Sequence, residues 1–121
     1  MPLHSHTMDN RWPFESVVHD VVAQLAAGRY ADLERRTRGV RLSADALAHA
    51  VREYGRQVIP PPDAVLPLDV VPITGAELPA WSVNVPLWTA EEGRSDLTLE
   101  LTVRAGPAGA YDVEIDDLHV L

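Results

Sequence analysis

The stretch Leu97-Thr98-Leu99-Glu100-Leu101-Thr102-Val103-Arg104 alternates strictly between apolar and polar residues. This period of two is typical of a β-strand with one buried face and one solvated face. The pattern predicts that the odd-numbered side chains of this strand point into a core. The even-numbered side chains, Glu100 among them, are expected to lie on the opposite face of the sheet.

Three other segments extend the sheet. Residues 81–88 alternate in the same way before the quoted stretch, and residues 111–120 follow it after a turn rich in glycine and proline. Leu66 to Ile73 is an earlier strand, which Pro67 and Pro72 assign to the edge of the sheet because proline donates no ladder hydrogen bond. The order of these segments predicts a four-stranded antiparallel meander.

The last of these strands changes phase near its end. Its apolar residues stand at odd positions as far as Ile115, and at even positions from Leu118 to Val120. One extra residue around Asp116-Asp117, a β-bulge, would place both sets on the same face of the sheet. We therefore expect a bulge at this point.

The first half of the chain has a helical period. Residues 14–28 carry apolar side chains at intervals of three and four, the pattern of one buried stripe on a helix. Two shorter helices are expected at 29–39 and 43–55, the latter capped by its first residue, a serine. Its small residues suit packing against the first helix. Residues 57–67, with three consecutive prolines, are expected to be a stiff connector.

Together the segments predict a single α+β domain over residues 12–121, with three N-terminal helices packed on one face of the sheet. Residues 1–11 are polar and aperiodic, and we expect them to form a disordered tail. No apolar run approaches the ~20 residues of a membrane span. The N-terminal segment also lacks the pattern of a secretory signal. A cytoplasmic location without membrane contact is the expectation.

The chain has 121 residues, a formal net charge of −8 and no cysteine. The lack of cysteine excludes a disulfide scaffold, a thiolate metal site and a cysteine nucleophile. The negative charge argues against a nucleic-acid partner. Residues 61–121 hold eleven acidic residues and only two arginines. The basic cluster of Arg35, Arg36, Arg38 and Arg41 is interpreted as pairing with this acidic half, with an anion or partner patch as the alternative.

Two resemblances follow from these segments. A set of short motifs is similar to a bacterial domain family with no assigned activity, over roughly residues 12–121. The motifs are Tyr54-Gly55, Pro61-Pro62, Trp81-Ser82-Val83, Leu87-Trp88-Thr89, Glu91-Glu92-Gly93-Arg94-Ser95-Asp96-Leu97 and Leu118-His119-Val120-Leu121. The order of a long helix, a Gly-Arg-Tyr-Ala-Asp-Leu turn, further helices and a meander also resembles the nuclear-transport-factor and SnoaL-like cone and its cystatin-like relatives. That resemblance implies a pocket between the helices and a concave sheet face.

The densest polar cluster in the sequence is the segment Trp88–Asp96, between the two middle strands. A pair of carboxylates serves as acid and base only when their environments differ, and adjacent Glu91 and Glu92 at a loop tip would differ little. We interpret the segment as a hairpin turn with Gly93 at positive φ. Its exposed side chains, Arg94 among them, also suit a recognition surface.

Asp112, Glu114 and Asp116 are expected to lie beside Glu100 on an acidic face of the sheet. Side chains two residues apart on a strand stand about 6.6 Å apart and diverge, whereas a cation needs converging oxygens. We therefore expect no metal site there. Closely spaced like charges repel, so the face suits a basic protein partner. His119 is interpreted as a satisfied or solvent-facing histidine.

The preferred function is a non-catalytic interaction domain, regulatory or toxin-neutralising, that binds a basic protein through Trp88, the hairpin and the acidic face. Trp88 points away from the inward set of its strand, so it either covers the hairpin or lies in an interface. A homodimer through the sheet is one such interface. No catalytic residue and no cofactor is predicted. The alternative function is a small-molecule binder or enzyme that uses the cone pocket.

Overall fold

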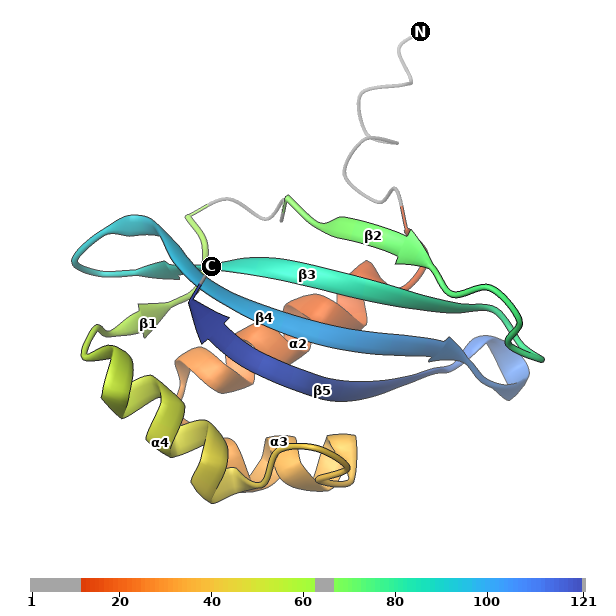
Figure 1. Cartoon of the computed structure of the whole chain (residues 1–121), viewed down its shortest axis with the longest axis horizontal. Coiled ribbons are helices and arrows are strands. Elements are labelled where there is room, and N and C mark those ends of the chain that lie inside the picture. The colour runs from red at the N-terminus through yellow and green to blue at the C-terminus, as the bar shows by residue number, and fades with distance from the viewer. Residues whose placement is uncertain (1–11, 63–66, 121) are drawn as a thin grey trace, which may run out of the picture.

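The computed structural model describes residues 12–62 and 67–120, in which helices precede an antiparallel sheet. The helices are α2 (Glu15–Ala26), α3 (Tyr30–Thr37) and α4 (Ala44–Tyr54). The strands are β1 (Val58–Ile59), β2 (Asp69–Pro72), β3 (Ala80–Thr89), β4 (Gly93–Ala105) and β5 (Tyr111–Val120), and the 3-10 turn η1 (Pro107–Gly109) joins β4 to β5 (Figure 1). The predicted α+β class is confirmed.

The sheet is a meander in which β3, β4 and β5 follow one another and both short strands pair with β3. β1 pairs at residues 88–89 and β2 at residues 81–84, so the two share one flank of β3. The predicted count of four strands is wrong, because the described residues form five. β1 lies within residues 57–67, which were expected to form a connector. It was not predicted because two residues are too few to show the alternation of a strand. β2 lies at the edge, as its proline predicts, while Leu66 lies outside the described residues.

The predicted bulge is confirmed in β5. Leu101 pairs with Ile115 and Glu100 pairs with Asp117, so Asp116 is the extra residue. Leu118 is consequently returned to the buried face, where it is 7% exposed. Val120, at the end of the strand, is 54% exposed and does not join the core.

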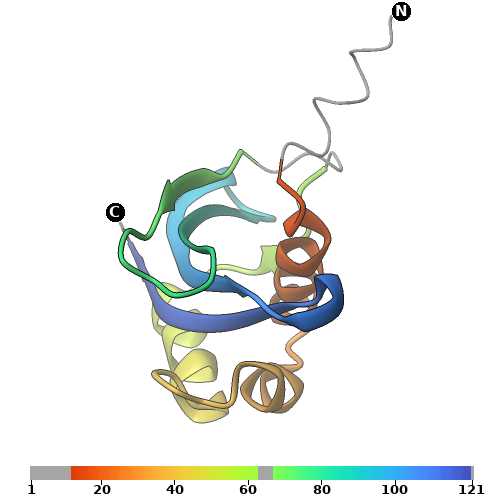
Figure 2. The same ribbon diagram turned by 90° about the vertical axis from the view of Figure 1, so that its right-hand side faces the viewer.

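The core lies between α2 and the concave side of the sheet, which curves around this helix in Figure 2. The odd-numbered residues 97–103 of β4 are at most 2% exposed, as their alternation predicts. Phe14, just before α2, is fully buried, and its ring centroid lies 4.9 Å from that of Trp81 and 6.0 Å from that of Tyr111. These aromatic contacts join the start of α2 to β3 and β5.

The other two helices lie below β5 in Figure 1. Ser43 caps α4 by accepting a hydrogen bond from the Ala46 amide at 3.1 Å, and Gly55 ends the helix at a φ of 75°. α4 packs mainly against α3 and β5, rather than against α2 as its small residues suggested. Within the described residues, no helix has both the length and the apolar character needed to cross a membrane.

Candidate functional site

The hairpin between β3 and β4 is tied to the segment that follows α4. Gly93 turns the hairpin at a φ of 74°, as predicted. The Glu91 carboxylate accepts a hydrogen bond from the Gln57 amide at 2.9 Å, and the Ala90 amide donates to the Gln57 carbonyl at 2.9 Å. Glu91, predicted to contact a partner, therefore holds the hairpin against the start of β1.

Glu92 lies at the centre of a second group of hydrogen bonds. The Tyr54 hydroxyl lies 2.8 and 2.9 Å from its two carboxylate oxygens, and Thr89 Oγ1 donates to one of them at 3.0 Å. Ser95 Oγ lies 2.6 Å from the same tyrosine oxygen. These bonds, with that from Tyr54 foremost, lower the pKa of Glu92. Glu92 thus fastens the hairpin to the last residue of α4.

Three of the predicted residues in this segment have free polar or aromatic surface. Arg94 and Asp96 are exposed, and the described residues provide no ion pair for either. Trp88 is half-buried and alternates with the buried Leu87 and Thr89, so its side chain lies on the face away from the core. These three side chains are therefore not engaged in ion pairs within the described residues, whereas the two glutamates of the hairpin are hydrogen-bonded within the chain.

The acidic face of β5 is less free than the sequence suggests. Arg38 bonds Asp112 at 2.9 Å and Glu114 at 3.3 Å, and Arg104 bonds Glu114 at 2.9 Å. The Glu114 side chain is only 12% exposed between these two arginines. The expectation of three solvated carboxylates on this strand is therefore corrected, because their charges are largely compensated. Asp116 likewise lies 3.6 Å from Arg41. Arg38 and Arg41 thus pair with the acidic half as predicted, whereas Arg35 and Arg36 pair with Asp32 and Asp20 in the first half of the chain.

A second set of carboxylates lies on the same face. Asp69 pairs with Asn84, Asn84 with Glu100, and Glu100 with Asp117, so the four side chains form a row across four strands. We call Asp69, Glu100 and Asp117 the acidic row. Within the described part of the chain, no arginine lies within 4.0 Å of their carboxylates.

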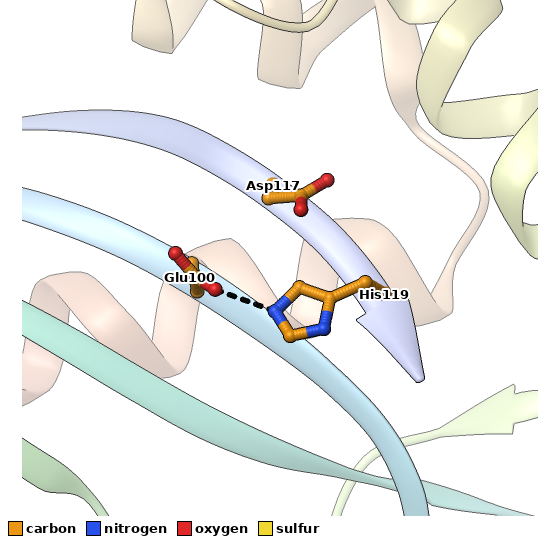
Figure 3. A group of neighbouring side chains, drawn as sticks. All are labelled: Glu100, Asp117 and His119. Atoms are coloured by element: carbon orange, nitrogen blue, oxygen red, sulfur yellow. Dashed lines mark hydrogen bonds and ion pairs between the residues drawn. The ribbon is translucent and has the colours of Figure 1, made fainter. Parts of the chain in front are cut away.

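His119 stands beside the acidic row (Figure 3). Its Nε2 lies 2.5 Å from Glu100 Oε2, and this hydrogen bond is the main cause that raises the pKa of His119. The side chains of His119 and Glu100 are 30% and 38% exposed, so the pair faces solvent. The expectation of a satisfied or solvent-facing histidine is confirmed, but its contact with Glu100 was not anticipated.

A family model described as a domain of unknown function (DUF7668) matches residues 22–121. The chain belongs to this family. The match confirms the resemblance to a family without assigned activity, and the matched part of the DUF7668 domain includes the hairpin, the acidic row and His119. Comparison with curated proteins and with solved structures gives no match.

The DUF7668 domain also has an open groove on the outer side of α2. It has a volume of about 330 Å³ and is lined by residues of α2, including His19 and Asp20, and by Pro60, Pro61 and Pro62. This groove is not the pocket that the cone resemblance implies, because it lies on the polar side of α2. The space between α2 and the sheet is occupied by core side chains.

Sequence reasoning missed Asp69 and Asn84 as neighbours of Glu100, and it missed the contact between Glu100 and His119. A signal was available, because strand pairing can be counted back from a turn. Ala105 pairs with Tyr111, and one bulge residue then brings Asp117 opposite Glu100. By contrast, no local pattern relates Tyr54 to the hairpin, 38 residues away.

Proposed function

We propose that this DUF7668 domain is a non-catalytic interaction module that binds a basic protein on the face of the sheet away from α2. The observation that supports this most is the acidic row, three carboxylates without an arginine partner among the described residues. The helices lie on the other side of the sheet or below β5, so the row is accessible (Figure 2).

The physical argument rests on charge and desolvation. Like charges on neighbouring strands repel one another, so a cationic side chain placed between them lowers the free energy of the pair. Exposed Asp96 and half-buried Trp88 extend the face toward the hairpin. An aromatic side chain at the margin of a charged surface provides the apolar contact that charges alone lack.

The test is partner capture with charge variants of matched shape. Glu100→Gln with Asp117→Asn removes two charges from the acidic row, and Glu53→Gln with Glu77→Gln removes two exposed charges elsewhere. A partner captured from an extract of the native cell is purified, and its binding is measured at low and high salt. We expect the first pair to slow association and to weaken the salt dependence, because charge complementarity acts mainly on the association rate. Equal binding by both pairs would overturn the proposal.

We further propose that the protein is a regulatory or toxin-neutralising protein of the bacterial cytoplasm. The identity of the purified partner tests this role. A second copy of the chain is the other candidate partner, because exposed Arg94 is available to cross over to the acidic row. Sedimentation of the purified domain, with Arg94→Gln as the variant, separates a homodimer from a complex with another protein.

A small-molecule binder is the second candidate function, and the groove beside α2 favours it. Its volume of about 330 Å³ falls within the roughly 300–1,000 Å³ of ligand sites. The curvature of the sheet around α2 in Figure 2 supports assigning the fold to the cone-like class, with its SnoaL-like and cystatin-like members. A fragment screen by NMR tests this function, since shifts confined to His19 and its neighbours would favour it over the acidic row.

A further inference from the structure

The side chains of Glu100, Asp117 and His119 lie close together on the uncovered face of the sheet, with Asp117 beside the hydrogen-bonded pair (Figure 3). Their ligating atoms, one from each residue, all lie within 4.8 Å of one another. Two carboxylates and one imidazole are a donor set that binds divalent transition metals. The expectation of no metal site was based on the spacing of side chains along one strand, whereas this cluster forms across two strands.

The convergence has a definite structural cause. Glu100 and Asp117 are direct cross-strand neighbours, with strands about 4.8 Å apart. Asp117 and His119 are two residues apart on β5, so they share a face. The bulge at Asp116 decides which face that is. If Asp116 were paired as an ordinary residue of the strand, Asp117 and His119 would turn toward the core.

We propose that Glu100, Asp117 and His119 form a binding site for Zn²⁺ or a similar divalent transition metal, with the remaining coordination position open to solvent. Zinc bound tetrahedrally at ~2.0–2.2 Å sets its ligand atoms roughly 3.3–3.6 Å apart. The contact of 2.5 Å between His119 Nε2 and Glu100 Oε2 therefore opens slightly on binding, and Asp117 moves inward. All three side chains are exposed or half-exposed, so this adjustment does not disturb the core.

Neighbouring groups orient two of the three ligands. Asp117 Oδ1 accepts a hydrogen bond from the Leu118 amide at 2.9 Å, which leaves the second carboxylate oxygen for the metal. His119 also has a hydrogen bond with the backbone of Val120. Such outer contacts, which fix the orientation of a ligand, are typical of metal sites in proteins.

Glu100 on β4 and Asp117 on β5 are the charged groups that face His119. Two carboxylates beside one imidazole favour a divalent cation at this point of the sheet.

The experiment titrates Zn²⁺ into the full chain by calorimetry and Co²⁺ by visible absorption. The chain carries His4→Ala and His6→Ala, because these two N-terminal histidines also offer ligands to a metal. We expect one Zn²⁺ per chain, and a Zn²⁺-dependent shift of the His119 imidazole signals in NMR spectra. Ca²⁺ and Mg²⁺, which prefer oxygen ligands only, are expected to leave those signals unchanged.

Variants distinguish a defined metal site from a general attraction of the cation to the negative charge of the acidic row. We expect three variants, His119→Gln, Glu100→Gln and Asp117→Asn, each to weaken Zn²⁺ binding at least about tenfold. Loss of an outer contact alone typically weakens metal binding by about that factor. Asp69→Asn removes a charge from the same row without removing a ligand, and should change the affinity little. The proposal is overturned if Asp69→Asn weakens binding as much as Asp117→Asn does, or if the His119 signals do not respond to Zn²⁺. No partner is involved, so this result and the partner-binding result are independent.

Discussion

Two single-residue deletions in β5 test the bulge on which the candidate site depends. Deleting Asp116 removes the extra residue, and Ile115 and Asp117 keep their partners Leu101 and Glu100 in an unbulged ladder. The loss is the hydrogen bond from Thr102 at 2.6 Å and the ion pair with Arg41. We expect the free energy of unfolding to fall by only about 1 kcal/mol.

Deleting Glu114, by contrast, leaves no pairing in which both Val113 and Ile115 stay buried. If residues 111–113 keep their places, Ile115 moves to the solvated face and Asp116 enters the core. If residues 115–120 keep theirs, Val113 is exposed and an aspartate again enters the core. Val113 and Ile115 are each 2% exposed, so exposing either costs ~1.5–3 kcal/mol, and burying the aspartate costs at least about 2 kcal/mol more.

Urea unfolding followed by tryptophan fluorescence measures both deletions. We expect the deletion at Glu114 to lower the free energy of unfolding by at least about 3.5 kcal/mol, a large share of the roughly 5–15 kcal/mol of a typical domain. The deletion at Asp116 should leave the folded baseline unchanged. If the two deletions cost the same, Asp116 is not the extra residue, and the derivation of the cluster around His119 is wrong.

Three further predictions concern the hairpin, the histidine and a helix cap. Tyr54→Phe removes the hydroxyl that holds the hairpin, so the thermal midpoint should fall more than in the control Tyr30→Phe, as melting curves would show. The pKa of His119 is raised in the folded state; its contribution to stability is therefore complete below the unfolded value of about 6.5 and lost as pH rises through the folded value. Urea unfolding at several pH values should show that the difference in free energy of unfolding between the wild type and His119→Gln falls across that range. A constant difference would contradict the assigned contact with Glu100. Ser43→Ala should cost ~1 kcal/mol in urea unfolding because it removes an N-cap, whereas an unchanged midpoint would mean that the cap does not stabilise α4.

Features that depend on a short stretch of sequence could be predicted. The alternation in β4 assigned its buried side chains correctly, and the change of phase after Ile115 located the bulge. Ser43 and Gly55 marked the ends of α4, because capping depends on residue type within one helical turn. In each case the physical cause acts over a few residues.

Features that depend on tertiary packing could not be predicted. Arg38 and Asp112 are 74 residues apart in sequence, and their ion pair exists only because the end of α3 reaches β5. Glu91 and Glu92 looked like a solvated loop tip, yet both bond to the segment around Tyr54. The candidate site lies between these cases, because the bulge was predictable and the proximity of His119 to Glu100 required the pairing register as well.

The proline content of one flank of the sheet has a consequence for self-association. Pro60, Pro61, Pro62, Pro67 and Pro72 stand in or between the two short strands beside β3, and none has an amide hydrogen to offer a neighbouring molecule. A flank built in this way is a poor template for adding a strand from another chain, the route by which open sheets polymerise into fibres. Stacking of molecules side by side is thereby disfavoured on this flank, even at high protein concentration.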